Sequence, residues 1–354
     1  MQDASLFLSK LAQKYKLDLL GTVRLQESGF KKEIIDWVRQ ASFGQMTWYL
    51  NNLSRRLDPR QNLWGKARSA IVAGVFYRPA QIPAQLKSDP SRGLIAAYAW
   101  YDDYHKWFKK RLTSFIREFS ALYKGDFQYR VYVDTGPLLE KELASQAGLG
   151  FIGKNTTFIN QIKGSYFFLG EIIVDVDLPQ LRWQKEEELP SNLPTPTCGL
   201  CRRCLDACPT GALTSPYKLD ARLCISYLTI EHRGSIPENL RPLMRNWIFG
   251  CDICQNVCPW NKKVKSWSDL PVRTEMVAPA LLDLVDLSED DFRNYFRNSP
   301  VLRTGYSGFM RNVMIALGNW GEKRAALAVK NFLDHPDKII RDHARWAWQQ
   351  IKNK

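Results

Sequence analysis

Eight cysteines are the residues best suited to chemistry in this 354-residue chain, and all of them lie between positions 198 and 258. The first four follow the pattern Cys-x2-Cys-x2-Cys-x3-Cys-Pro, which begins at Cys198 and ends at Pro209. Bacterial ferredoxins hold 4Fe–4S clusters with this spacing, and the fourth cysteine of the run binds a second cluster. A further group of four ends in the same way before Pro259. The sequence therefore predicts two 4Fe–4S clusters, which carry one electron at a time.

The ferredoxin pairing rule divides the eight cysteines into two sets of four, with none left over. The first set is Cys198, Cys201, Cys204 and Cys258, and the second set is Cys208, Cys224, Cys251 and Cys254. Two zinc sites or disulfides are the alternatives, but zinc sites rarely need such a run, and clustered cysteines in a reducing cytosol are more often metal ligands. The second set departs from ferredoxin symmetry, because Cys224 lies 27 positions before Cys251. We expect a modified ferredoxin module built into a larger protein.

Composition and charge narrow the class of protein. Hydrophobic residues make up 45% of the chain and charged residues 24%, which is ordinary globular composition and excludes long disorder. Fifty basic and thirty-six acidic residues give a net charge of +14, which favours a polyanionic partner such as nucleic acid. The sequence has no run of 18 uncharged apolar residues and no signal-peptide pattern at its start. We expect a cytoplasmic monomer without a membrane part.

The pattern along the chain predicts a mixed fold, α/β or α+β, in three parts. Residues 1–60 have helical patterns; strands are expected at 70–77, 129–133 and 166–176, and further helices at 100–123 and 138–147. These elements predict an α/β sheet domain over 1–183. A polar, proline-rich connector at 185–196 leads to the ferredoxin-like module at 195–264, and a helical region follows at 265–354.

The C-terminal region is predicted to be an array of helices. Three apolar faces follow one another from about residue 303, with a turn at 334–337, which is typical of HEAT-type repeats. Residues 301–354 contain ten basic and four acidic residues. Three of the arginines, Arg311, Arg341 and Arg345, could follow a phosphate backbone. A solvated helical face is the alternative interpretation.

Asp134 is the candidate catalytic residue. It follows the predicted strand at 129–133 and precedes a predicted helix, and functional groups gather at the carboxyl ends of strands in α/β sheets. A helix cap is the common alternative for an aspartate at this place. A glycine-rich turn follows at 148–155. Because a helix precedes the turn, a dinucleotide site is disfavoured. The turn could instead bring backbone amides and Lys154 close to a bulky polar cofactor, or be purely structural.

Several of these segments together resemble the epoxyqueuosine reductase family. The matching motifs are Asp134-Thr135-Gly136-Pro137, the turn 147–155, the cysteine run with Ala207-Cys208-Pro209-Thr210-Gly211-Ala212, the stretch 224–229 and the stretch 250–259. They occur in the family's order, and the resemblance extends from about Arg56 to the C-terminal helices. It implies a cobalamin-binding α/β domain, a ferredoxin-like module with two 4Fe–4S clusters and HEAT-like C-terminal helices.

The resemblance also implies an activity and a set of site residues. The activity is the reduction of epoxyqueuosine to queuosine at the wobble position of tRNA, with electrons from an external low-potential donor. Asp134 is implied as the proton donor, and a carboxylic acid can do this near neutral pH only if burial raises its pKa. The implied cobalamin contacts are Arg56, Asp134, Lys154, Asn155, Leu169, Ser226 and Asp252. His232 and Arg233 are candidates for a tRNA-facing role.

Two other functions are compatible with the iron–sulfur motifs. One is a corrinoid reductase of a small molecule, similar to reductive dehalogenases, which would not need a net charge of +14 or a basic tail. The other is a non-enzymatic electron carrier or a scaffold with structural clusters. The size of the domain before the cysteines, together with Asp134 and Lys154, argues against the second alternative.

Overall fold

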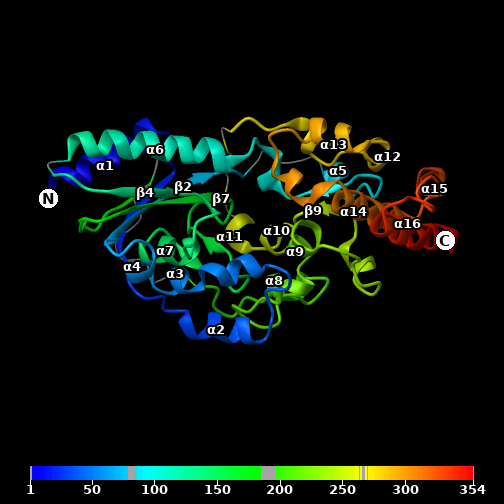
Figure 1. Cartoon of the computed structure of the whole chain (residues 1–354), viewed down its shortest axis with the longest axis horizontal. Helices are drawn as coiled ribbons and strands as arrows, with labels where there is room; N and C mark the ends of the chain where they lie inside the picture. The colour runs from blue at the N-terminus through cyan, green and yellow to red at the C-terminus, as the bar shows by residue number, and fades with distance from the viewer. Residues whose placement is uncertain are drawn as a thin grey trace.

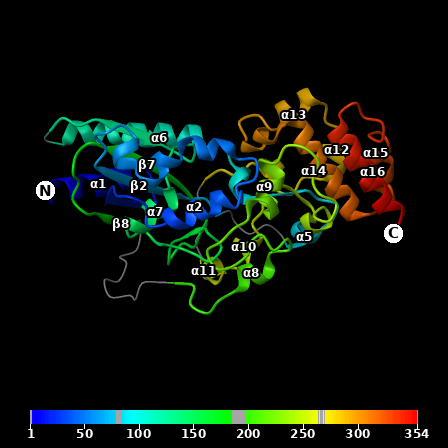
Figure 2. The same ribbon diagram turned by 60° about the horizontal axis from the view of Figure 1, so that its bottom comes forward.

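The computed structural model describes residues 2–78, 84–123, 125–184, 197–262, 264, 268 and 270–353. The predicted connector at 185–196 lies outside the described residues. The molecule is elongated, with a sheet region at the end that holds the N-terminus and packed helices at the end that holds the C-terminus (Figure 1). Figure 2 shows the same separation of the two ends from another side.

A five-stranded sheet forms the first part within the described residues, in the order β4-β7-β2-β1-β8. The strands are β1 (Leu19–Arg24), β2 (Ser69–Phe76), β4 (Tyr129–Tyr132), β7 (Phe167–Val174) and β8 (Arg182–Gln184). Every pair of neighbours is antiparallel. Of the two mixed folds that the sequence left open, α/β and α+β, this antiparallel sheet identifies the α+β kind. The expectation that 1–60 is wholly helical is wrong, because β1 lies there and pairs with β2 and β8.

Helices cover both faces of this sheet. Helices α1 (Gln2–Lys14) and α6 (Tyr104–Leu122) lie side by side on one face, and α3 (Leu53–Leu57), α4 (Pro59–Asn62) and α7 (Glu140–Gln146) lie on the other (Figure 1). Helix α6 is long because its apolar residues recur with helical spacing and are fully buried: Phe108, Leu112, Phe115, Ile116 and Phe119. Its opposite face, rich in lysine, stays in solvent. A further helix, α2 (Lys31–Arg39), follows β1.

Short elements make up the cysteine-rich part. They are α8 (Arg203–Ala207), a 3-10 turn (Ala221–Leu223), α9 (Ile225–Ile230), a second 3-10 turn (Pro242–Met244), β9 (Trp247–Phe249), α10 (Ile253–Asn256) and α11 (Pro259–Lys262). The ribbon β5 (Phe151–Ile152) and β6 (Phe158–Ile159) lies before this part in the chain. Cysteines that are spaced three residues apart cannot all point at one cluster if they lie on one long helix. The helices of this part are therefore short.

The C-terminal part is helical, as expected. It contains α12 (Leu281–Val285), α13 (Glu289–Tyr295), α14 (Gly305–Trp320), α15 (Lys323–Lys330) and α16 (Lys338–Lys352), with 3-10 turns at Thr274–Met276 and Pro300–Thr304. Helix α14 is buried along most of its length and packs against α16, α15, α12 and β9. The repeat type of these helices stays a prediction.

Packing does not follow the three predicted segments. Strand β3 (Leu94–Ile95), a 3-10 turn (Ala97–Trp100) and α5 (Ala84–Ser88) belong to the predicted first domain, yet β3 pairs in parallel with β9 of the cysteine-rich part. The amide of Gly93 donates to the carbonyl of Pro279, and that of Leu281 donates to the carbonyl of Ser91. One large core of buried apolar residues runs from α1 to α16. The three parts therefore fold against one another.

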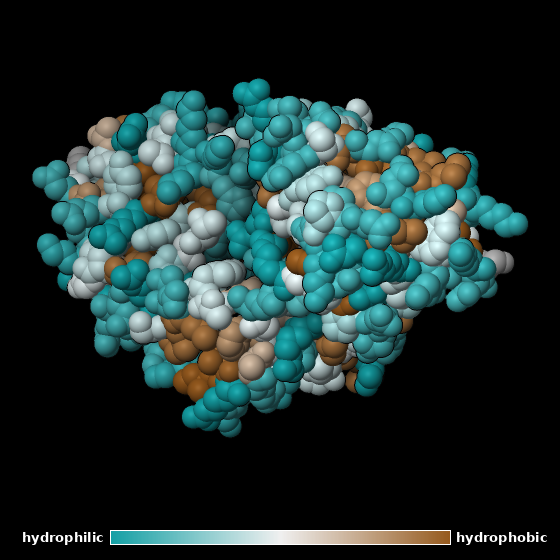
Figure 3. Space-filling view, turned by 45° about the vertical axis from the view of Figure 1, so that its right-hand side comes forward, coloured by the Kyte–Doolittle hydropathy of each residue, from teal (hydrophilic) through white to brown (hydrophobic). Residues whose placement is uncertain are grey.

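The surface is dominated by polar side chains. The face in Figure 3 is largely hydrophilic with scattered hydrophobic patches, in keeping with the net charge of +14. None of the helices formed by the described residues has both the length and the apolar character needed to cross a bilayer.

Arg311 was expected to contact RNA, and the structure places it in the interior instead. It lies on α14 and is completely buried. Its guanidinium donates to the carbonyl oxygens of Leu228, His232 and Gly234 at 2.7–2.9 Å and to the side chain of Asn312. The expectation is wrong for this residue, because a helical pattern of basic residues does not show which face a partner element will cover.

We expect Arg311→Met to destabilise the fold by about 3 kcal/mol or more, since three buried carbonyl groups lose their donor and each costs about 1–3 kcal/mol when left unpaired. Lys330→Met on the exposed side of α15 is the matched control and is expected to change stability by less than about 0.5 kcal/mol. Anaerobic urea unfolding of the cluster-loaded protein measures both. Equal stability of the two variants would contradict the structural role of Arg311.

Candidate functional site

Asp134 lies directly after β4 in an unusual backbone conformation. Its φ of +56° places it in the left-handed region, which aspartate tolerates better than most residues. The helix-cap alternative does not apply, because α7 begins only at Glu140 and its N-cap is Leu139. The side chain is about half exposed, and its Oδ2 lies 2.9 Å from Nε2 of His105. The strand end therefore presents a carboxylate that a histidine holds in place.

His105 is held in turn by Asp103, so that three side chains form a chain of hydrogen bonds. His105 lies in the first turn of α6, and Asp103 is the N-cap of that helix. Oδ1 of Asp103 accepts from the backbone amide of His105 at 3.1 Å and lies 2.6 Å from its Nδ1. The imidazole also stacks on Tyr104 with the ring centres 4.2 Å apart. Both ring nitrogens face carboxylates, which is the environment that a protonated imidazole needs.

The charges around the three hydrogen-bonded side chains favour a proton on His105. Burial lowers the pKa of His105, but the hydrogen bonds that its ring donates to the carboxylates of Asp103 and Asp134 outweigh burial and raise that pKa to about 9. Burial raises the pKa of Asp134, but the hydrogen bond and the charge of His105 outweigh it and leave that pKa below its ordinary value. The expectation that the pKa of Asp134 is raised is therefore wrong. At neutral pH the proton therefore lies on His105, 2.9 Å from the ionised Asp134.

Arg56 supports the same loop from another element. It lies on α3, is 5% exposed, and its Nη1 donates to the carbonyl of Gly136 at 3.4 Å. Its guanidinium stacks over Tyr49 at 4.5 Å. Its Nε is buried and has no hydrogen-bond partner within the described part of the chain. Arg56 thus fixes the loop after Asp134 and keeps one donor for a ligand.

Two buried glutamates lie behind Asp134. Burial, followed by the charge of Asp134, raises the pKa of Glu140 to about 8. Glu171, completely buried on β7, has its pKa raised well above the ordinary value by burial and then by Glu140. Nζ of Lys141 donates to the carbonyl of Thr156 at 2.9 Å. Burial lowers the pKa of Lys141, whereas the charges of Glu140, Cys254, Asp134 and Cys224 raise it, so Lys141 lies in the electrostatic surroundings of both Asp134 and the second cysteine set.

The cysteines lie in two different surroundings. Cys258 is buried in a small apolar cluster with Phe151 and Ile159, and Cys198 packs against that cluster. Cys224 and Cys251 pack against the large core. Burial raises the pKa of the Cys254 thiol to about 12 and that of Cys251 further, so these sulfurs need a metal partner to become thiolates. In the described residues no three His, Cys, Asp or Glu side chains converge on one metal ion; each cysteine of a 4Fe–4S cube binds a different iron.

The glycine-rich turn at 148–155 contacts the loop that carries the first cysteines. A methyl group on Gly150 would lie 2.3 Å from the carbonyl oxygen of Ile159, so only glycine fits between β5 and β6. The backbone amide of Lys154 donates to Sγ of Cys198 at 3.3 Å, and its Nζ donates to the carbonyls of Gly199 and Cys201. Lys154 is thus bound to the loop of the first cysteine set, and its contact with cobalamin stays a prediction. Asn155 is 5% exposed, and its Nδ2 has no partner among the described residues.

The comparisons with known proteins agree with this geometry. Residues 56–135 match the family described as "Epoxyqueuosine reductase QueG, DUF1730", and residues 197–261 match the "4Fe-4S double cluster binding domain". An epoxyqueuosine reductase of Pseudomonas aeruginosa is 40% identical over 315 residues, which are 88% of this chain and 84% of that protein. The chain belongs to the epoxyqueuosine reductase family. The family's enzymes are oxidoreductases, and the predicted iron–sulfur module is confirmed at the level of the matched domain.

Two solved structures of the family are also similar to this chain. One is an epoxyqueuosine reductase with an epoxyqueuosine-modified tRNA-Tyr stem loop, with a TM-score of 0.83, 28% identity and coverage of 98% of this chain and 91% of that chain. The other, from Bacillus subtilis, has its catalytic aspartate loop swung out of the active site, with a TM-score of 0.83, 26% identity and the same coverage.

Three other residues that the family resemblance implied as cobalamin contacts are buried or half-buried in the fold. Leu169 is 8% exposed in the apolar layer between the sheet and α7. Ser226 is the second residue of α9, two positions after Cys224, and is half-buried. Asp252 is 6% exposed and accepts from the amide of Ala97 at 2.7 Å. Their roles toward cobalamin stay predictions.

The predicted RNA contacts also make bonds within the protein. Arg233 donates to the carbonyls of Ile230, Thr304 and Arg303. Arg341 donates to the carbonyls of His335 and Pro336, and Arg345 donates to that of Leu333. Nε2 of His232 lies 3.1 Å from the carbonyl oxygen of Ser235, and burial lowers the pKa of this imidazole. Their contacts with RNA stay predictions.

Sequence reasoning missed several residues of this site: Asp103, His105, Glu140, Lys141 and Glu171. The motif Asp103-Tyr104-His105 at the start of a long amphipathic helix was the available signal, because an aspartate cap followed by a histidine places an imidazole at a helix end. Glu171 could have been found as a carboxylate inside an apolar strand, an arrangement that is unusual without a partner.

We expect the two cysteine sets to behave as two separate units. Under the predicted division, Cys208→Ala removes about half of the iron, and Cys208→Ala/Cys224→Ala removes no more, because both residues bind one cluster. Cys208→Ala/Cys198→Ala is the matched comparison and should remove nearly all the iron. Iron analysis and EPR of the anaerobically reconstituted proteins measure this. Greater iron loss in the Cys208/Cys224 double variant than in the single variant contradicts the division.

Proposed function

We propose that this protein reduces epoxyqueuosine to queuosine in tRNA, with the Asp134–His105 pair supplying a proton. The observation that carries the proposal is the chain Asp103–His105–Asp134 at 2.6 and 2.9 Å, in a protein whose cysteine-rich part matches a double-cluster domain. The relative solved with an epoxyqueuosine-modified tRNA stem loop supports tRNA as the substrate.

The chemical balance of the reaction explains why both parts are needed. Conversion of an epoxide to an alkene breaks two carbon–oxygen bonds and releases the oxygen as water. It consumes two electrons and two protons. The two proposed 4Fe–4S clusters pass single electrons from an external low-potential donor. The Asp134–His105 pair is placed to give one proton to the departing oxygen, and the second proton comes from solvent.

The polar groups of Arg56, Asn155, Glu140 and Glu171 fit a cobalamin. Nε of Arg56 and Nδ2 of Asn155 are buried donors without a partner in the described chain. Glu140 and Glu171 interact with each other, and because burial raises the pKa of both carboxyl groups, they can donate as well as accept. Cobalamin carries primary amides that both donate and accept, and a phosphate that accepts. When bound, it supplies a strongly reducing cobalt centre for the electron transfer. Arg56, Asn155, Glu140 and Glu171 are the residues that we propose to hold it.

The first and second cysteine sets have different places in the proposed electron path. The second set lies near Lys141, which also interacts with Glu140 and Asp134. Cys198 and Cys201 of the first set are half exposed, and Leu200 between them is 98% exposed. We propose that electrons enter at the first set and leave from the second.

The protein's own residues control the proton. His105 keeps the proton while Asp134 stays ionised and half exposed. As the oxygen of the substrate departs, the proton passes from His105 across the 2.9 Å contact to Asp134 and from there to the oxygen, which leaves His105 neutral. Asp103 holds the imidazole in the required orientation. Arg303 adds positive charge to the surroundings, since it interacts with Asp134 and pairs with Glu231 at 2.6 Å.

The test is anaerobic turnover of reconstituted protein with a low-potential reductant and epoxyqueuosine-containing tRNA, with and without added cobalamin. Nucleoside mass spectrometry reports the modified base. Queuosine that forms only when cobalamin is present supports the proposal. Lack of product despite intact clusters and bound cobalamin contradicts it and favours a small-molecule substrate.

Asp134→Asn is expected to lower the single-turnover rate by at least about 100-fold, because an amide cannot take a proton from His105 and pass it to the substrate, and general acid catalysis contributes about 100- to 10,000-fold. Iron content and cobalamin binding, followed by absorbance, should be unchanged. Asp102→Asn, an exposed aspartate near the start of α6, is the control. Full activity of Asp134→Asn removes this residue as the proton donor.

The pH dependence follows from the raised pKa of His105, which is about 9. The imidazole is protonated below that pH and loses its proton above it, so the rate should fall on the alkaline side near pH 9. In Asp103→Asn the imidazole loses a carboxylate partner, its pKa falls, and the alkaline limb moves to lower pH. Asp102→Asn should keep the parent profile. Identical profiles for Asp103→Asn and the parent would rule out His105 as the proton store.

A further inference from the structure

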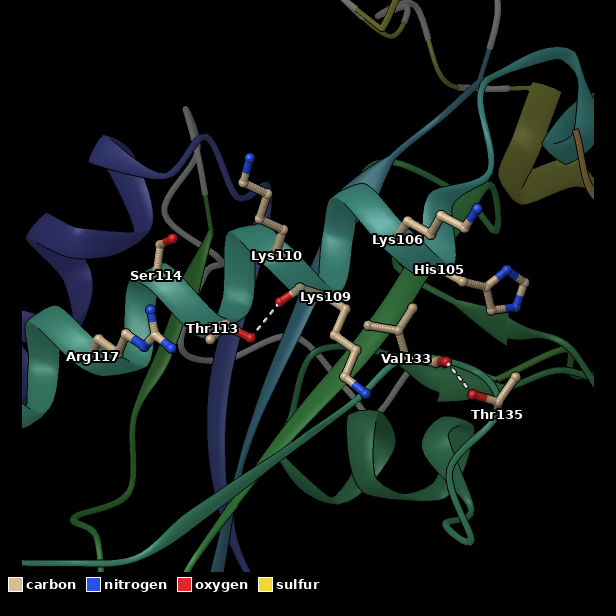
Figure 4. A pocket seen from close by; sticks show the side chains of 9 residues that line it. All are labelled: His105, Lys106, Lys109, Lys110, Thr113, Ser114, Arg117, Val133 and Thr135. Carbon is tan, nitrogen blue, oxygen red and sulfur yellow. Dashed lines mark hydrogen bonds between the residues drawn. The ribbon is translucent and has the colours of Figure 1, made fainter. Parts of the chain in front are cut away.

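A groove begins at the active-site loop and runs along α6. It lies between α6 and the end of β4, with a volume of about 580 Å³, and His105, Val133 and Thr135 line its inner end. Figure 4 shows Lys109 reaching from α6 beside Val133, while Lys106, Lys110 and Arg117 extend from the same helix. Because His105 contacts Asp134, the groove opens next to the carboxylate proposed to act on the substrate.

The groove is strongly basic, and its charges are not neutralised within the protein. Lys106, Lys109, Lys110 and Arg117 are all exposed, and none of them forms an ion pair with another described residue. Glu118 is the only acidic residue within α6, and it is already bound by Lys14 at 2.6 Å and by Tyr15 at 2.8 Å. The four cations are therefore available to an external anion.

This availability distinguishes the groove from the basic C-terminal region. Arg311 is buried, and Arg233, Arg341 and Arg345 donate to backbone carbonyls of the protein. Those guanidinium groups stabilise turns and helix ends. The cations of α6 have no comparable bond in the described chain, and their groove reaches His105, which contacts Asp134.

The shape of the groove fits an extended strand that carries regular negative charge. From His105 to Arg117 the helix rises by about 18 Å, at 1.5 Å per residue, so the cations are distributed along a path and not gathered at a point. The hydroxyl groups of Thr113, Ser114 and Thr135 line the same groove. Lysine, arginine and hydroxyl groups are the usual partners of phosphate oxygens and sugars in nucleic-acid complexes.

We propose that the α6 groove binds the sugar–phosphate backbone of the substrate RNA strand next to the nucleotide being reduced. This inference rests on the proposed function. It assigns the main RNA contact near the reacting base to α6 instead of the C-terminal arginines. A strand that enters the cleft at Asp134 continues along the groove, where its phosphates meet successive cations.

The test is binding of an unmodified anticodon stem-loop RNA to the full, cluster-loaded protein over a range of salt concentrations. The groove variant is Lys109→Gln/Lys110→Gln/Arg117→Gln, which leaves His105 and its neighbour Lys106 in place. The control is Lys323→Gln/Lys330→Gln/Lys338→Gln, which removes the same charge from exposed positions of α15 and α16. Iron content and circular dichroism verify that both variants are folded.

Each lost contact with single-stranded RNA should reduce the slope of log K against log salt by about 0.7. The groove variant is therefore expected to lose about 2 from the slope and, at 0.1 M salt, on the order of 100-fold in affinity. Its KM for substrate tRNA should rise accordingly. The control variant should retain the parent slope and affinity.

The outcomes separate this inference from the proposed function. If the parent binds RNA and forms queuosine but the groove variant binds as tightly as the control, the groove proposal is wrong and the function stands. If the control loses affinity and the groove variant does not, the C-terminal region is the RNA site. If the parent neither binds RNA nor forms queuosine, the proposed function fails, and the groove proposal fails with it.

Discussion

The contact between His105 and Asp134 is the interaction on which the proposed chemistry depends. Asp134 has a left-handed backbone conformation with φ +56°, and a non-glycine residue keeps such a conformation only where its surroundings hold it. His105 binds its carboxylate, and Arg56 binds the carbonyl of Gly136 two positions later. The loop is thus held from α6 on one side and α3 on the other. In a solved relative from Bacillus subtilis the catalytic aspartate loop is swung out of the active site.

The proposed reaction needs electrons and a proton at the same place, and the interleaving of the three parts of the fold supports this. Trp37 donates to the carbonyl of Leu219 at 2.8 Å, and the amide of Gln45 donates to the hydroxyl of Tyr227 at 2.7 Å. These contacts join the segment after β1 to the cysteine-rich part. The pairing of β3 with β9 does the same from the other direction. The cysteine loops are therefore fixed relative to Asp134 by hydrogen bonds as well as by the shared core.

Positive charge serves two different purposes in this protein. Guanidinium groups such as that of Arg311 are desolvated and satisfied by several carbonyl groups, which makes them part of the fold. The lysines of α6 remain in solvent beside the cleft. Arginine suits the first purpose because its planar group donates several hydrogen bonds in fixed directions. Net charge alone does not distinguish the two uses, and only burial and partners do.

The sequence by itself determined the iron–sulfur chemistry, because that chemistry depends on the spacing of the cysteines. The run from Cys198 to Pro209 predicts iron–sulfur ligation because ligand spacing in a short loop is a local property. The apolar runs located β2, β4 and β7, and helical periodicity located α6 and the C-terminal helices, for the same reason. The short strand β1 was missed, since its pattern of Leu19-Leu20-Gly21-Thr22 is too short to separate from its helical neighbours.

Only the tertiary structure decided what depends on contacts between distant segments. Strand direction in the sheet was one such feature, because a local pattern does not show which edge a strand pairs with. The partnership of His105 with Asp134, 29 positions apart, was another, and it reversed the expected shift in the pKa of the carboxylate. The burial of Arg311 and the exposure of the α6 lysines were decided in the same way. The sequence sets the charge of a side chain, but the fold sets its exposure to solvent and its partners.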